Sequence, residues 1–168
     1  MRTKNYSRAR GALAGLGLVL VLALLAQPAR AASWKGLEPF VSKRADVERV
    51  LGAPASDRVA ENGTLHFNVS GGTVTVFFVT PKFVAAKKLS PSLEGTVLQI
   101  VLQHERATDT PESLNLVQNS AFERQAKGPT EVYTNAKDGV IYTFIDSRLR
   151  TTRYSYSMEQ LTRIQRGK

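Results

Sequence analysis

The side chains that most often carry out catalysis are few in this sequence. It contains no cysteine, and its two histidines, His66 and His104, are far apart in the chain, each on or at the end of a predicted strand. Thiol catalysis, disulfides, cysteine metal sites and a lipoprotein anchor are therefore excluded, and neither histidine has the neighbours of a catalytic triad or a zinc site. Phosphate-loop and serine-hydrolase motifs are missing. We expect a protein that is not an enzyme and uses no cofactor or metal.

Arginine and tyrosine are concentrated near the C-terminal end of the chain, where they could form a protein-binding surface. The candidate binding residues are Arg148, Arg150, Arg153, Tyr154 and Tyr156. Both residue types are favoured interface anchors, because planar groups hydrogen-bond and stack with little entropy to lose. The same alternation also suits an edge strand that resists edge-to-edge aggregation. The sequence leaves both interpretations open.

The first 31 residues have the three-part pattern of a secretory signal peptide. Residues 1–10 are basic, residues 11–26 are apolar, and Ala29 and Ala31 are small residues at the positions that signal peptidase recognises. We therefore expect cleavage near Ala31, a secreted or periplasmic protein, and no transmembrane span after cleavage. A retained anchor is the alternative, although the apolar run is shorter than the about 20 residues that a bilayer requires.

The net charge is less positive after the predicted cleavage. Over the whole chain the formal charge is +9, but five of the 23 basic side chains precede residue 32, which leaves 18 against 14 acidic ones and a net charge of +4. This balance argues against nucleic acid as a partner. Two groups of basic residues, one in the middle of the expected domain and one at its C-terminal end, could instead attach the protein to anionic envelope surfaces if folding brings them together; they are Lys82, Lys87, Lys88, Arg163, Arg166 and Lys168.

A short helix and a series of strands must position these side chains. Residues 42–54 predict the helix, with Ser42 as its N-cap and Val47 in its apolar stripe. Gly52 and Pro54 are typical of a helix end. Alternating and β-branched segments then predict antiparallel strands over residues 57–60, 64–69, 73–79, 96–104 and 148–157. Residues 139–145 are apolar on both faces, which predicts a central strand covered on both sides.

Two other segments complete the predicted domain, which spans residues 32–168. Residues 80–95 contain two prolines and three lysines, and they predict a solvated connection in preference to a binding loop. Residues 157–164 predict a short C-terminal helix capped by Ser157. The fold class is therefore α+β, with short helices packed on an antiparallel sheet.

The chain also shows a faint internal repeat. Residues 122–129 align with residues 47–54, since both contain a Glu-Arg pair and end in proline. This predicts two tandem helix-plus-strands units, with halves 40–105 and 112–160. The identities are few, so chance similarity is the alternative.

The segment from Trp34 to Pro54 resembles known families. Its Ser-Lys-Arg-Ala-Asp-Val-Glu-Arg-Val-Leu-Gly-Ala-Pro helix, followed by a hairpin, is similar to the SmpA/OmlA (BamE) outer-membrane assembly lipoproteins. It also resembles the fold group of the β-lactamase inhibitory protein. Trp-x-Gly-Leu-x-Pro, Asp-Val and Leu-Gly-x-Pro resemble uncharacterised exported bacterial proteins of this length. The resemblance implies helix-on-sheet units that bind protein, although this chain lacks the lipidated cysteine of one group and the disulfides of the other.

Together these features predict an exported, non-enzymatic protein-binding or envelope-assembly module. Its partner would be another envelope or extracellular protein. The alternative is an envelope hydrolase, because carboxylates that only folding brings together cannot be recognised in a sequence. The sequence does not indicate the oligomeric state.

Overall fold

The computed structural model describes residues 32–55 and 63–167. The predicted signal peptide, residues 1–31, and the strand predicted over residues 57–60 lie outside these ranges. Within them, none of the helices has both the length and the apolar character needed to cross a membrane.

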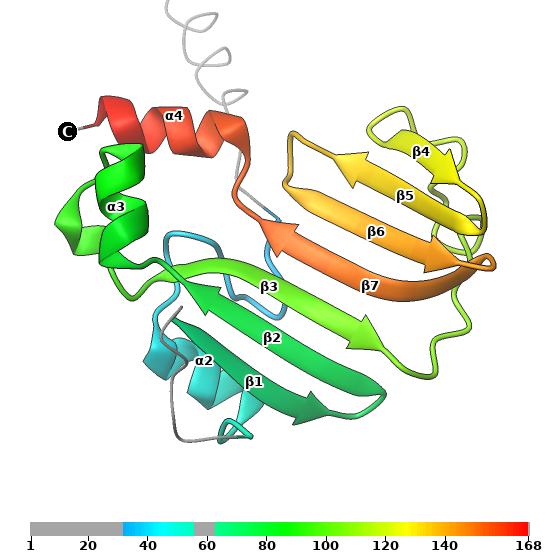
Figure 1. Cartoon of the computed structure of the whole chain (residues 1–168), viewed down its shortest axis with the longest axis horizontal. Helices are drawn as coiled ribbons and strands as arrows, with labels where there is room; N and C mark the ends of the chain where they lie inside the picture. The colour runs from blue at the N-terminus through cyan, green and yellow to red at the C-terminus, as the bar shows by residue number, and fades with distance from the viewer. Residues whose placement is uncertain (1–31, 56–62, 168) are drawn as a thin grey trace, which may run out of the picture.

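The core of the fold, within the described ranges, is one seven-stranded antiparallel sheet (Figure 1). Its strands follow the order β1-β2-β3-β7-β6-β5-β4, so two meanders meet where β3 pairs with β7. The strands are β1 Thr64–Val69, β2 Gly72–Phe78, β3 Val97–His104, β4 Glu123–Lys127, β5 Thr130–Asn135, β6 Val140–Ile145 and β7 Arg148–Ser155. The predicted α+β fold class, with helices and an antiparallel sheet, is confirmed.

In the described part of the chain, three α-helices and one 3-10 helix accompany the sheet; they are α2 Arg44–Leu51, α3 Pro81–Lys87, η1 Pro91–Leu93 and α4 Met158–Arg166. Helix α2 lies behind β1 and β2 in Figure 1, whereas α3 and α4 lie together at one end of the sheet. The C-terminal helix begins as predicted, because the Ser157 hydroxyl accepts a hydrogen bond from the Gln160 N–H at 3.1 Å.

Two apolar clusters fill one face of the sheet, which we call the covered face. Under α2 and the segment before it, Leu65 and Phe67 of β1 pack with Val47, and all three are at most 1% exposed. Under β5 and β6, Tyr133 and Phe144 meet edge to face at 5.7 Å between ring centres, and Leu116 from the connection between β3 and β4 packs on them. A helix therefore covers one half of this face, and an irregular segment covers the other.

A third cluster ties the beginning of the domain to its end. Phe40 packs between Phe83 of α3 and Tyr156, with ring centres 6.3 and 5.1 Å away. The Gln160 side-chain amide of α4 donates to the Pro39 carbonyl at 3.0 Å. This cluster holds α3 and α4 at the end of the sheet.

The helix expected to open the second unit is a strand instead. Residues 123–127 form β4, which pairs with β5 across a two-residue turn at Gly128 and Pro129. Gly128 has φ +58°, which glycine adopts without strain and which suits the first position of a hairpin turn. The segment also lacks an apolar stripe, so nothing favours a helix there. The proposed halves 40–105 and 112–160 therefore do not both begin with a helix.

Two smaller expectations were also wrong. Ser42 does not cap α2, because its buried hydroxyl accepts from the Glu38 N–H at 2.9 Å; the helix begins one residue later, with Lys43 at the cap position. Residues 80–95 are not simply a solvated connection. Pro81 occupies the first turn of α3, where a missing N–H costs nothing, and Thr80 accepts from the Phe83 N–H at 3.2 Å.

We predict that Phe144→Ala lowers the free energy of unfolding by about 3–5 kcal/mol, because the ring is fully buried and its loss leaves a cavity. Ile145→Ala is the matched control: this adjacent side chain is 37% exposed, so its loss should cost about 1 kcal/mol or less. Urea denaturation measures both values. Equal losses would contradict the assignment of Phe144 to the core.

Candidate protein-binding face

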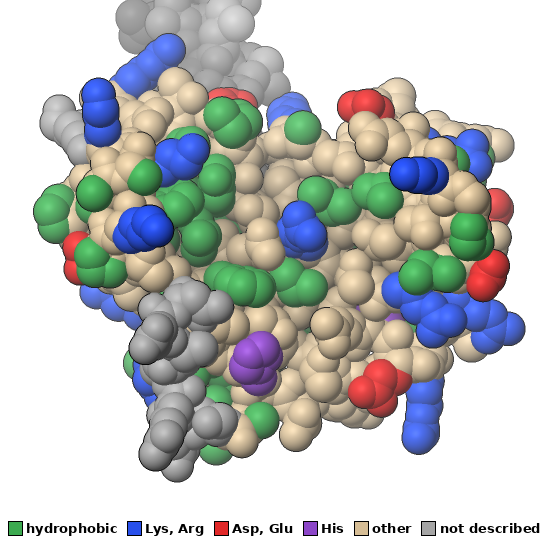
Figure 2. All heavy atoms as spheres, in the orientation of Figure 1, with side chains coloured by type: hydrophobic (Ala, Val, Ile, Leu, Met, Phe, Trp, Pro, Cys, Tyr) green, Lys and Arg blue, Asp and Glu red, His purple; other side chains and the backbone are tan. Residues whose placement is uncertain are grey.

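The other face of the sheet is not covered by a helix over most of its described area, and we call it the open face. It points toward the viewer in Figure 2, where apolar patches cross its middle and acidic side chains lie near its margins. One row of paired residues crosses all seven strands of this face; it runs His66, Thr75, Val101, Arg153, Ile141, Thr134 and Glu123.

Arg153 stands at the centre of this row. It is exposed, and its neighbours across the two adjoining strands are Val101 and Ile141. Among the residues that the structure describes, no carboxylate forms an ion pair with it. The guanidinium is therefore available to a ligand, and the aliphatic groups on both sides supply apolar surface around it.

A shallow hollow of about 250 Å³ adjoins Arg153 where β7 leads into α4. Its lining includes Gln99, Ile141, Ser155 and Met158. Pockets for drug-sized ligands typically measure about 300–1,000 Å³ and bury most of the ligand. The hollow is smaller than that, and it suits a single side chain of a partner protein better than a whole small molecule.

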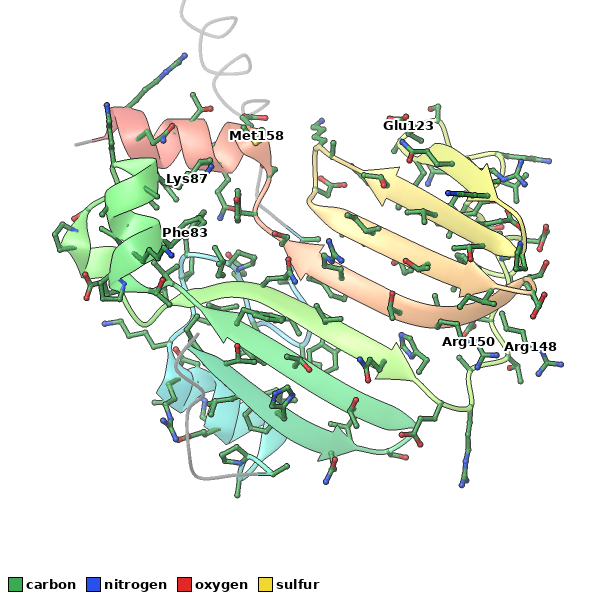
Figure 3. All side chains as sticks on the ribbon, in the orientation of Figure 1. Phe83, Lys87, Glu123, Arg148, Arg150 and Met158 are labelled. Carbon is green, nitrogen blue, oxygen red and sulfur yellow. The ribbon has the colours of Figure 1, made fainter. Side chains whose placement is uncertain are left out.

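The five residues singled out in the sequence do not share one surface. Arg148, Arg150 and Arg153 are exposed, but Figure 3 shows Arg148 and Arg150 at the end of β7 farthest from Met158 and α4. Strand β7 lies between β3 and β6 in the middle of the sheet. The interpretation of Arg and Tyr as edge-strand protection is therefore wrong.

Both tyrosines contribute mainly to packing. Tyr154 alternates with Arg153 and lies on the covered face against the first apolar cluster. Burial raises the pKa of Tyr154 to about 12, and the nearby Tyr142 adds to this shift. Tyr156 packs on Phe40 and Phe83. As binding residues the five remain a prediction, but only Arg153 lies at the centre of the open face.

Sequence reasoning missed the threonine, glutamine and aliphatic side chains around Arg153. Several of them alternate with core residues: Thr73 and Thr75 flank the fully buried Val74, and Gln99 and Val101 flank the fully buried Ile100. The period-two pattern predicted two different faces for each strand. It did not indicate which face the helices would cover.

The two histidines lie on opposite faces and do not form a site together. His66 is exposed on the open face, with Nδ1 3.1 Å from the Thr75 hydroxyl. His104 is partly buried on the covered face, with Nε2 2.9 Å from the Thr152 hydroxyl. Burial lowers the pKa of His104, and the negative charge of Asp109 partly opposes the shift. In the described ranges, no cluster of three or more potential ligands could hold a metal ion.

Comparison with known proteins returned one similar solved structure. No family model matches the chain, and no curated protein matches it. The crystal structure of a DUF4309 family protein, YjgB, from Bacillus subtilis subsp. subtilis str. 168 is similar with a TM-score of 0.49 and 13% sequence identity. The similarity covers 73% of this chain and 84% of that chain.

We predict that the domain loses stability in mild acid and that His104→Gln reduces the loss. The unfolded chain takes up a proton near the ordinary histidine pKa of about 6.5, whereas the folded chain resists it because the pKa of His104 is lowered. The stabilisation is therefore complete above the unfolded pKa and is lost as pH falls through the lower, folded pKa.

Urea denaturation across this pH range measures the effect. His66→Gln is the matched control, since its ring lies exposed on the open face, and this variant should keep the acid sensitivity of the wild-type domain. A pH profile that His104→Gln leaves unchanged would contradict the role of burial at this position.

Proposed function

We propose that this chain is an exported, non-enzymatic module that binds another envelope or extracellular protein through its open face. The observation that supports the proposal most is the row of partly exposed side chains that crosses the whole sheet with Arg153 at its centre. The predicted signal peptide supports export. We further propose that the helix and hairpin at the start of the domain reflect a relation to the BamE-like or β-lactamase inhibitory protein-like groups.

The chemistry of the open face favours a protein over a polyanion or a small molecule. Threonine and glutamine side chains donate and accept hydrogen bonds, while Phe77, Val101 and Ile141 offer partly exposed apolar area. A folded partner can use both kinds of group at once, with arginine as the central anchor. Such binding should persist in moderate salt, because an apolar contact is not screened by ions.

The proposal predicts that Arg153→Glu weakens partner binding by about tenfold or more, the range expected for an arginine hot spot. The expected domain, residues 32–168, serves as bait for envelope and extracellular proteins of its own source at low and moderate salt. Mass spectrometry identifies the proteins retained by the wild-type bait, and the affinity of each for the variants is then measured with purified partner.

Arg148→Glu provides the matched control. Both arginines are exposed on β7 and pair with an isoleucine of β6, Ile141 opposite Arg153 and Ile145 opposite Arg148, but only Arg153 is central. Circular dichroism verifies that both variants fold. Equal binding of the same salt-resistant partner by the two variants, or retention of salt-labile material alone, would refute binding through the centre of the open face.

A further inference from the structure

Strand β4 forms one edge of the sheet, and its outer side pairs with no other strand among the residues described. All five of its residues are exposed, and Figure 3 shows Glu123 at the corner of the molecule away from α3 and α4. An exposed edge is a template for another strand, and proteins normally cover or block it. The backbone orientation and the side-chain charges of β4 determine which strand can pair with it.

The turn that follows β4 determines which backbone groups point outward. Lys127 and Thr130 flank the two-residue turn and face each other in the ladder, and the closing pair of such a hairpin directs its hydrogen-bonding groups inward. Orientation alternates along an antiparallel strand. The N–H and C=O groups of Arg124 and Ala126 therefore point away from β5 and are available to a new strand.

A second copy of β4 can pair antiparallel with these groups in three ways, according to the residue on the two-fold axis. An axis at Arg124 places two arginines opposite each other, which repel. An axis at Ala126 leaves Glu123 beyond the paired region. An axis at Gln125 places Glu123 opposite Lys127 of the other copy, twice by symmetry, and Arg124 opposite Ala126. Only this last register pairs every charge on the open side of β4 with its opposite.

We propose that the chain forms a symmetric dimer in which β4 pairs antiparallel with β4 of a second copy, with the two-fold axis at Gln125. The pairing joins the two sheets edge to edge. Because the axis is perpendicular to the sheet, both open faces lie on the same side of the dimer. Arg124 keeps its ion pair with Glu131 of its own chain, in which Nε lies 2.9 Å from Oε2.

The other edge of the sheet favours a dimer over a longer assembly. Along β1, the Ala55 N–H already donates to the His66 carbonyl at 2.7 Å, so Ala55 lies against that edge and occupies one of its outward-facing carbonyls. A sheet with two open edges would extend into a fibre, whereas one with a single self-complementary edge closes as a dimer.

Charge reversal tests both the partner and the register. Glu123→Lys and Lys127→Glu each replace two attractive cross-strand pairs with two repulsive ones, and each should weaken self-association about tenfold or more. An equimolar mixture of the two variants restores both attractive pairs, and so does the double variant. Sedimentation velocity of the domain 32–168, up to about millimolar protein because a single-strand interface is small, measures the dimer fraction.

Lys87→Glu on α3 and Glu105→Lys after β3 are the controls with matched change in net charge, since both side chains are exposed away from β4. They should self-associate as the wild-type domain does. Ala126→Pro removes one outward N–H without touching the hairpin bonds and should also abolish the dimer. A wild-type domain that is monomeric at every concentration, or a dimer that the β4 reversals leave unchanged, would overturn the proposal.

Discussion

The fold depends on one long-range ladder, the pairing of β3 with β7. All the other neighbours in the sheet are consecutive in the chain, so they can form as hairpins and meanders. The β3–β7 register places Ile100 opposite Tyr154 and Val101 opposite Arg153. One pair extends the covered core across both meanders, and the other places an arginine at the middle of the open face. A single ladder therefore makes one continuous surface from two small sheets.

The strand pattern was largely predictable, because alternating burial imposes period two on the sequence. The segments around Leu65, Val74 and Ile100 show it and form strands. The segment around Phe144 is apolar on both faces and forms the internal strand β6, but Ile141 on its open face is only partly buried, so the expected cover on both sides was wrong. The failures have physical reasons. Pro81 suggested a break, yet proline is favoured in the first turn of a helix. All five residues 123–127 are exposed, so no burial requirement imposes an apolar alternation on them. Their pairing with β5 depends instead on the turn at Gly128.

The candidate site was less predictable than the fold. Alternation separates Arg153 from Tyr154, but it does not show which of the two faces a helix will cover. That choice depends on tertiary packing: α2 and the segment carrying Leu116 lie on one face, whereas α3 and α4 lie at the end of the sheet. The sequence grouped the arginines of β7 with Tyr154 and Tyr156, although the fold exposes the arginines and packs both tyrosines against apolar clusters.

The contact between the two ends of the domain also has a consequence for synthesis. Phe40 lies between Phe83 and Tyr156, and Pro39 accepts a hydrogen bond from Gln160, a residue 121 positions later in the chain. A chain that stops before α4 leaves these aromatic rings without their cover. Exposed apolar surface of this kind is what proteases and chaperones recognise in incomplete proteins. Loss of α4 would therefore expose part of this apolar cluster, and we expect a domain without α4 to be more sensitive to proteolysis and aggregation.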